Sequence, residues 1–308
     1  MTRTREDGKE EVFSACIKHD DTRYLGGNKS SSVVATKLQG RPRTGINYDK
    51  ANEFCANRGD WITMIDYLEY CAIQALCYIE YANFNNQAAL NTNLTSEGFK
   101  QGGLGAGVTN LAWDRWTAFN GNNPIVQTYW SAEHNIGNGN TNGDHYELSA
   151  YNDDGSNFST YPAFYHGIHL FGDIWSLVRD VVIINKDTNY NSVYLLKKGV
   201  AHADVTVDNV DEKCYFIGYQ ANANNYITEF DLQRGPYFVP NLVGTNKKFD
   251  YNYIRGSNGQ DTDKSVRMLL VGGRAHYGSL AGSGGFNSDW VRSVSDATVG
   301  FFTTVKLD

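Results

Sequence analysis

The last forty residues of this 308-residue chain constrain its fold more than any other stretch. Two apolar runs, at residues 268–271 and 299–305, border a segment dense in glycine and serine. β-Branched and aromatic residues favour strands, whereas glycine and serine favour turns. This order predicts a rigid pair of strands that presents an irregular surface between them. Such an arrangement suits binding better than catalysis.

Composition and charge exclude several kinds of partner. The chain has 34 acidic against 27 basic residues, a formal net charge of -7, which repels phosphate backbones and anionic lipids. No apolar run reaches the roughly 20 residues that span a bilayer, and no apolar stretch follows the basic N-terminus. We therefore expect no nucleic acid partner, no membrane insertion and no signal peptide. Because no linker divides the chain, we expect a flexible tail at 1–10 and a single domain at 11–308.

Five cysteines, an odd number, are spread along the chain without any C-x-x-C spacing. This pattern argues against a zinc knuckle and against a full disulfide framework. Buried free thiols are the favoured interpretation, and one long-range disulfide stays open as the alternative. The cysteines are Cys16, Cys55, Cys71, Cys77 and Cys214.

Two helices are expected in the first third of the chain. Asn47 has the side chain of an N-cap for a short helix that Gly59 would end, with Ala51, Phe54 and Cys55 on its inner face. Residues 65–81 carry the strongest helical pattern, since apolar side chains step by three or four along one stripe. We expect this stripe to face the core. It consists of Ile65, Leu68, Ala72, Leu76 and Ile79.

The rest of the chain has the pattern of strands and long loops. A first strand is expected at 11–18, and the Asn-, Gly- and Ser-rich stretch 83–157 predicts long loops with short strands. Strand patterns then follow at 174–184, 192–196 and 215–219. Together these elements predict an α+β fold.

No residue pattern predicts a catalytic centre, a cofactor or a metal site. The run Gly278-Ser-Leu-Ala-Gly lacks the spacing of a hydrolase nucleophile turn. The turn at 152–157, from Asn152 to Asn157, offers oxygen ligands for calcium but lacks the later bidentate glutamate. A solvated turn is therefore favoured there over a calcium site. The histidines at 134, 145, 166 and 169 are not at metal-ligand spacing.

Three stretches together resemble the C-type lectin fold, in the branch shared by formylglycine-generating enzymes and the variable proteins of diversity-generating retroelements. The first stretch is the pair of expected helices. The second, residues 167–180, is similar to the Gly-Asn-Ile/Val-Trp-Glu-Trp-Val motif of that branch, with Asp173, Ser176 and Leu177 as departures.

The third stretch is the C-terminal segment itself. Gly272-Gly273 and Val299-Gly300-Phe301 resemble the start and the end of the hairpin region of that family. Here Arg274 and Ala275 replace the usual Ser-Trp, and Phe302 replaces the usual Arg. The resemblance implies an α+β C-type lectin fold, formylglycine-generating-enzyme-like, with two helices packed on short antiparallel sheets and long loop insertions.

In the retroelement branch, residues between these two markers are diversified at template adenines while the backbone stays fixed. The resemblance thus implies a variable ligand-binding segment at 272–301, with small fixed positions at Gly278, Ala281 and Gly282. Trp290 cannot arise from adenine changes in an Asn codon, so it would be a fixed anchor or the product of another codon. The ligand-binding positions implied are Arg274, His276, Tyr277, Ser279, Leu280, Ser283, Gly285, Phe286, Asn287, Ser288, Asp289, Trp290, Val291 and Ser293.

Proteins of this kind in phages and archaeal viruses bind receptors. The resemblance therefore implies a non-enzymatic adhesin of a virion, such as a phage tail or tail fibre, or a binder displayed on a cell surface. Its partner would be a protein or glycan receptor, and a homo-oligomer such as a trimer would add avidity. The alternatives are a structural virion protein without a diversified site and, less favoured, a formylglycine-generating-type oxidase. That oxidase uses C-terminal cysteines, and none follows Cys214 here.

Overall fold

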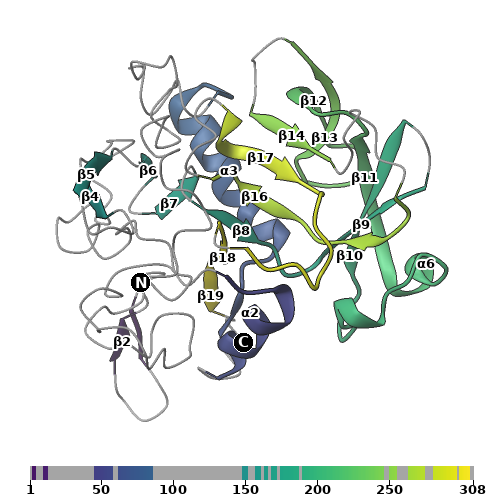
Figure 1. The fold of residues 1–308 in the computed structure, drawn as a ribbon, viewed down its shortest axis with the longest axis horizontal. Coiled ribbons are helices and arrows are strands. Elements are labelled where there is room, and N and C mark those ends of the chain that lie inside the picture. Colours follow the sequence, from purple (N-terminus) through teal and green to yellow (C-terminus); the bar gives the residue numbers. More distant parts are fainter. Residues whose placement is uncertain are drawn as a thin grey trace.

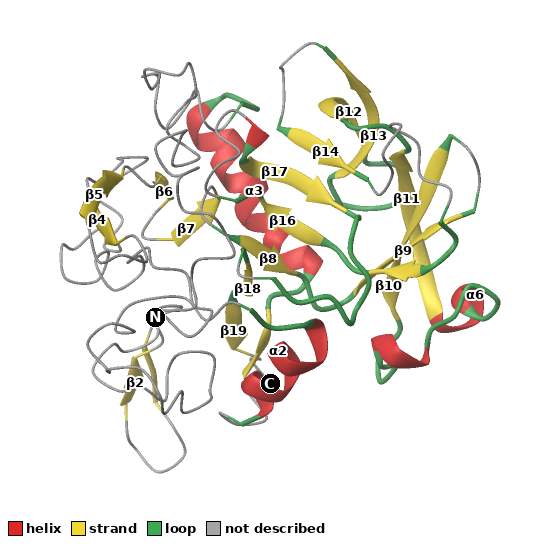
Figure 2. Ribbon diagram, viewed as in Figure 1, coloured by secondary structure: helices red, strands yellow, loops and turns green. Residues whose placement is uncertain are grey.

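The computed structural model has a mixed α+β fold that consists mostly of sheets, with few helices (Figures 1 and 2). No described helix is long and apolar enough to cross a membrane. The structure describes residues 2–4, 10–12, 45–57, 62–85, 148–151, 157–160, 163–165, 168–171, 174–186, 189–245, 250–254, 263–274, 280–296 and 298–305.

Helix α2, Tyr48–Ala56, begins where the sequence predicts. The side chain of Asn47 accepts a hydrogen bond from the backbone N–H of Lys50 at 2.9 Å, so Asn47 is confirmed as the N-cap. The predicted inner face is also confirmed, because Ala51, Phe54 and Cys55 are buried. Gly59, the predicted stop, lies outside the described residues.

Helix α3, Tyr67–Tyr81, begins with a capping box in which Asp66 and Glu69 satisfy each other's backbone N–H groups. The helix lies where it was predicted, but the predicted core stripe is wrong. Ile65 precedes the helix and is buried, whereas the four helical members of the stripe are exposed. The buried face consists of Tyr67, Tyr70, Cys71, Gln74, Cys77 and Tyr78.

Hydrogen bonds explain why α3 buries this more polar face. The hydroxyl of Tyr67 donates to the backbone carbonyl of Phe238, and that of Tyr70 to the carbonyl of Ser283, both at 2.8 Å. A buried tyrosine that finds such a partner contributes a large apolar ring without leaving its hydroxyl unsatisfied. The spacing of apolar residues alone did not contain this information.

The largest sheet has seven strands in the order β13-β12-β14-β17-β16-β8-β18. Its centre is β17, which pairs parallel with β14 and antiparallel with β16. The strands are β8 (Trp175–Leu177), β12 (Asn225–Asp231), β13 (Val239–Gly244), β14 (Tyr251–Tyr253), β16 (Leu270–Gly272), β17 (Gly282–Asn287) and β18 (Val299–Phe301).

A second sheet has four antiparallel strands in the order β11-β10-β9-β15. The predicted strands 192–196 and 215–219 lie within β10 and β11, while the predicted strand 174–184 is divided between β8 and β9. The four strands are β9 (Val181–Asn185), β10 (Tyr190–Leu196), β11 (Cys214–Ala221) and β15 (Val266–Arg267). The 3-10 turn His202–Asp204 and the short helix α6, Val210–Lys213, lie between β10 and β11.

Four small two-stranded pairings complete the described elements. β3 (Ile62–Met64) pairs with β19 (Thr303–Val305). β1 (Thr2–Thr4) pairs with β2 (Glu10–Val12), and β1 lies within the stretch 1–10 that was expected to be a flexible tail. Of the strand predicted at 11–18, residues 13–18 lie outside the described residues. The other two pairs join β4 (Leu148–Tyr151) with β5 (Asn157–Thr160) and β6 (Ala163–Tyr165) with β7 (Ile168–Phe171).

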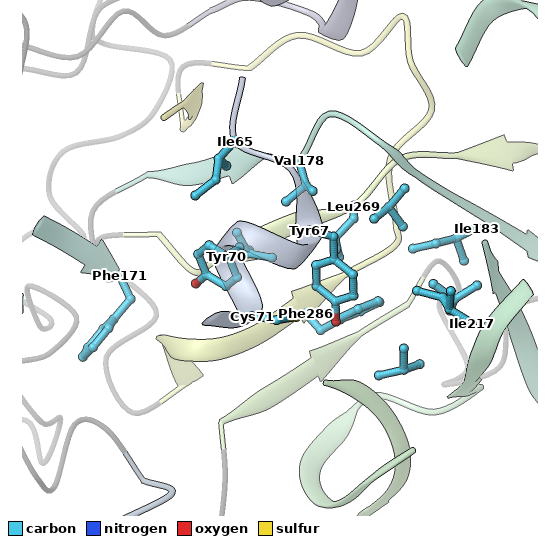
Figure 3. Packing of buried hydrophobic residues seen from close by; sticks show 14 of the residues in the cluster. Ile65, Tyr67, Tyr70, Cys71, Phe171, Val178, Ile183, Ile217, Leu269 and Phe286 are labelled. Atoms are coloured by element: carbon cyan, nitrogen blue, oxygen red, sulfur yellow. The ribbon is translucent and has the colours of Figure 1, made fainter. Parts of the chain in front are cut away.

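The two long helices cover opposite faces of the central sheet. Side chains alternate along a strand, so Leu270 and Val271 of β16 point to opposite sides. Leu270 packs in a cluster with α2, and Val271 packs in a cluster with α3. Figure 3 shows the cluster around α3, in which Tyr67 lies beside Phe286, while Ile183 and Ile217 of the second sheet belong to the same cluster.

Candidate functional site

The predicted binding segment begins with a backbone constraint that explains its glycine pair. Gly272 and Gly273 have φ angles of 91° and 80°, in the left-handed region that favours glycine. In addition, a methyl group at Gly273 would lie 2.8 Å from the Cα and Cβ of Ala281. The chain therefore turns tightly here and passes close to itself.

Strand β17 also needs small residues, because a buried carboxylate lies against it. A Cβ at Gly282 would lie 2.0 Å from Cγ of Asp250, and the N–H of Gly284 donates to this carboxylate at 2.7 Å. Ala281 is fully buried. These contacts leave no room for a larger side chain at Ala281 or Gly282, while Gly278 lies outside the described residues.

The structure buries five of the predicted ligand-binding positions. β17 has neighbours on both sides and is covered on both faces, so its side chains and the residue after it have no access to a ligand. Phe286 is only 2% exposed and lies 6.2 Å, edge to face, from the ring of Tyr67. The five positions are Ser283, Gly285, Phe286, Asn287 and Ser288.

The remaining predicted positions flank this buried strand. Arg274 and Leu280 are half-buried, and His276, Tyr277 and Ser279, which lie between them, are outside the described residues. After β17, Asp289 and Ser293 are exposed, and Trp290 and Val291 are half-buried. We refer to residues 288–296 as the outer loop.

Backbone hydrogen bonds fix the path of the outer loop. The carbonyl of Trp290 accepts from the N–H of Met268 at 3.1 Å, and Val291 forms a β-bridge with Arg267. Farther along, the carbonyl of Arg292 accepts from the N–H of Tyr48 at 3.4 Å, at the start of α2. Main-chain bonds of this kind do not depend on side-chain identity. The loop can therefore keep its path while its exposed side chains change.

Three side chains anchor the outer loop to the rest of the molecule. Trp290 packs against the α2 cluster, as expected of a fixed anchor. Arg292 forms an ion pair of 2.8 Å with Asp49 of α2, between two partly exposed side chains. The carboxylate of Asp296 accepts from the backbone N–H of Thr298 at 2.7 Å and closes the turn into β18.

Two buried cationic or titratable side chains lie beneath the outer loop, and neither was predicted. Arg267 is fully buried and donates to the backbone carbonyls of Ser288 and Asp263. His202 is buried with its ring centroid 4.9 Å from that of Tyr48, and its Nε2 has no hydrogen-bond partner among the described residues. Burial lowers the pKa of His202, so its ring is neutral.

A charged residue inside an apolar run could have indicated Arg267, which stands between Val266 and Met268. A buried arginine must find acceptors, and backbone carbonyls supply them here. His202 has no comparable signal, because it lies in a short turn between two strands of the second sheet.

The cysteines described by the structure are inert thiols. Cys55, Cys71, Cys77 and Cys214 are buried thiols that form no disulfide, which confirms the favoured interpretation for these four. Burial raises the pKa of Cys71 and Cys77 to about 12 and that of Cys214 to about 11. Such thiols stay protonated at neutral pH, and a metal ion prefers the thiolate.

The other candidate metal ligands lie outside the residues whose side chains the structure describes. Cys16, His134, His145 and His166 and the calcium-type turn at 152–156 lie outside the described residues. For His169 the structure describes only the backbone, in β7.

Comparison with known proteins gives no family for this chain. No protein-family model matches it, and neither does any curated protein.

Proposed function

We propose that this chain is a non-enzymatic binding protein of the C-type lectin type whose recognition surface is narrower than the sequence suggests. The surface consists of the exposed side chains of the outer loop, and the predicted positions His276, Tyr277 and Ser279 lie outside the described residues. Its partner is a protein or glycan receptor on a cell surface, and the chain itself belongs to a virion, such as a phage tail, or to a cell surface. The resemblance of the glycine pair and of the 299–301 marker to retroelement variable proteins supports diversification at these positions.

The observation that carries this proposal is the way the outer loop is held. Its backbone is bonded to the 267–268 segment and to the start of α2, while Asp289 and Ser293 are exposed. Binding surfaces that must vary need a fixed backbone and free side chains. Exposed side chains next to a half-buried aromatic anchor, Trp290, also match the composition of recognition surfaces.

A second candidate, a structural virion protein without a diversified site, is favoured by a different observation. The burial of Phe286 and its four companion positions leaves a smaller variable surface than the family pattern implies. The oxidase alternative has weaker support, since the raised pKa values of Cys71, Cys77 and Cys214 disfavour thiolate chemistry at these positions.

Sequencing the 3′ end of the gene across a natural population tests the proposal. We expect substitutions at codons 289, 291 and 293 and within 274–280, matched to adenines of a nearby template copy, and invariant codons at the five buried positions. A conserved outer loop with no template copy would favour the structural protein. Substitutions spread evenly through 282–288 would contradict the narrowed surface.

A further inference from the structure

Helix α3 exposes an apolar face to solvent. Leu68, Leu76 and Ile79 are 47%, 57% and 76% exposed. Ala72 and Ala82 lie on the same side and are also exposed. An apolar helix face is normally covered. We call this face the outer face of α3.

The outer face carries no charge. The helix has only two charged residues, Glu69 and Glu80, and both lie at one border of the face. The carboxylate of Glu69 accepts from the N–H of Asp66 and from the hydroxyl of Thr304, so it is held against its own molecule. A neutral apolar surface is best complemented by another neutral apolar surface.

The order of side chains along the outer face fits a second copy of the same helix. Positions 68, 72, 75 and 79 recur at alternating steps of four and three, the spacing of a helix–helix seam. The residues in the middle, Ala72 and Ala75, are small, and the residues at the ends, Leu68 and Ile79, are large. In an antiparallel pair of identical helices, the alanines would meet at the crossing point and each Leu68 would meet Ile79 of the other copy.

The exposed area suits a weak contact. Leu68, Leu76 and Ile79 leave roughly 300 Å² of apolar surface on each copy, the lower end of the largest patches on ordinary monomers. Even with the intervening alanines, a symmetric pair would bury less than about 1,000 Å² in total, as weak and transient interfaces do.

We propose that the outer face of α3 is a self-association surface, on which two copies of this chain pack their α3 helices antiparallel about a two-fold axis near Ala72 and Ala75. The same patch then serves both partners, as in isologous dimers. This inference rests on α3 alone and does not depend on the proposed binding function of the outer loop.

The first test measures the mass of the full chain in solution by sedimentation between about 1 and 100 μM, a range that covers micromolar dissociation constants. We expect a concentration-dependent dimer. The double variant Leu76→Glu/Ile79→Glu should weaken dimerisation at least about tenfold, because it would bury unpaired carboxylates. Leu232→Glu is the matched control, since Leu232 is 52% exposed but lies just after β12 and is not part of α3, and this variant should dimerise normally.

A monomer at all concentrations would overturn the inference. If such a monomer also protected the outer face of α3 from hydrogen exchange, another part of the same chain would be covering that face. A dimer that the double variant leaves intact would also overturn the inference. Circular dichroism of each variant shows whether it is folded.

A second test fixes the direction of packing and does not disturb the large side chains. Ala72→Cys and Ala82→Cys, each in a Cys16→Ser background, are treated with a short bifunctional maleimide; the other four cysteines are buried. In the antiparallel pair the two copies of position 72 lie close together, whereas the two copies of position 82 lie about 25 Å apart. We expect cross-linked dimer from Ala72→Cys alone. Equal cross-linking at both positions, or at 82 alone, would overturn the antiparallel arrangement.

Discussion

Single residues in this protein are constrained by atoms far away in the sequence, and Gly282 is the clearest case. A methyl group there would overlap the carboxylate of Asp250, which itself bonds the backbone of β17. Asp250 is buried and cannot move aside without losing that bond.

We therefore predict that Gly282→Ala lowers the free energy of unfolding by about 3 kcal/mol, as overpacking of a core does. Urea denaturation measures this change. Gly244→Ala is the control, because its methyl group would meet only a side-chain methyl of Thr228 at 3.3 Å. Similar losses in the two variants would show that Asp250 is free to relax.

His202 is predicted to make stability depend on pH. Burial lowers its pKa in the folded protein, whereas in the unfolded chain the pKa is about 6.5. Below about pH 6.5 the unfolded chain therefore takes up a proton that the folded protein does not, and the stability falls as the pH falls. Above that pH the contribution of His202 is constant.

The variant His202→Gln should lack this part of the pH dependence. Urea midpoints of both proteins are measured from pH 8 to pH 5, and the difference between them is taken at each pH. This difference cancels other groups, such as Asp180, whose pKa burial raises to about 6 and whose contribution has the opposite sign. Parallel curves for the two proteins would contradict the prediction.

At the scale of elements, the outer loop and β17 should respond differently to the same substitution. Ser293 is exposed on the outer loop, and Ser283 is fully buried in β17 under the tyrosines of α3. Ser293→Tyr should change the free energy of unfolding by less than about 0.5 kcal/mol, whereas Ser283→Tyr should cost more than about 3 kcal/mol or prevent folding.

Thermal unfolding of the two matched variants makes this comparison. If Ser283→Tyr were as stable as Ser293→Tyr, β17 could remodel, and the buried positions would again be candidates for variation. If Ser293→Tyr unfolded the protein, the outer loop would not be the tolerant element that recognition requires.

The elements also show what sequence patterns can and cannot reveal. The starts of α2 and α3 were predictable to within two residues, because Asn47 and the region around Asp66 carry local signals. The buried face of α3 could not be predicted in this way. Either face of the helix is apolar enough to be buried, and the hydrogen bonds of Tyr67 and Tyr70 to the carbonyls of Phe238 and Ser283 decide which one is. The spacing of apolar residues along a helix does not reveal which part of the chain the helix packs against.

Strand β17 was missed for a related reason. Its sequence, Gly-Ser-Gly-Gly-Phe-Asn, has the composition of a loop, and only its surroundings make it the centre of a sheet. Its small residues leave room for Asp250 and for the hydroxyls of Tyr70 and Tyr78. Five positions that the family resemblance implied as ligand-binding are buried, because the small residues of β17 let its neighbours pack closely against it.

At the scale of the whole molecule, the two surfaces proposed here lie on different elements. The outer loop is held by α2 and the 267–268 segment, whereas the self-association surface lies on α3, on the other face of the central sheet. A dimer through α3 would therefore leave both outer loops free. Two weak sites on one particle bind a surface with receptors much more strongly than one.

The pairing of β19 with β3 has a consequence for how the molecule is made. Ile65 just before α3 donates its N–H to the carbonyl of Phe302, and Thr304 reaches Glu69 across a separation of 235 positions. Translation therefore produces α2 and α3 long before it supplies β19. Until then β3 lacks its strand partner, so this pairing can form only after residues 303–305 have been made.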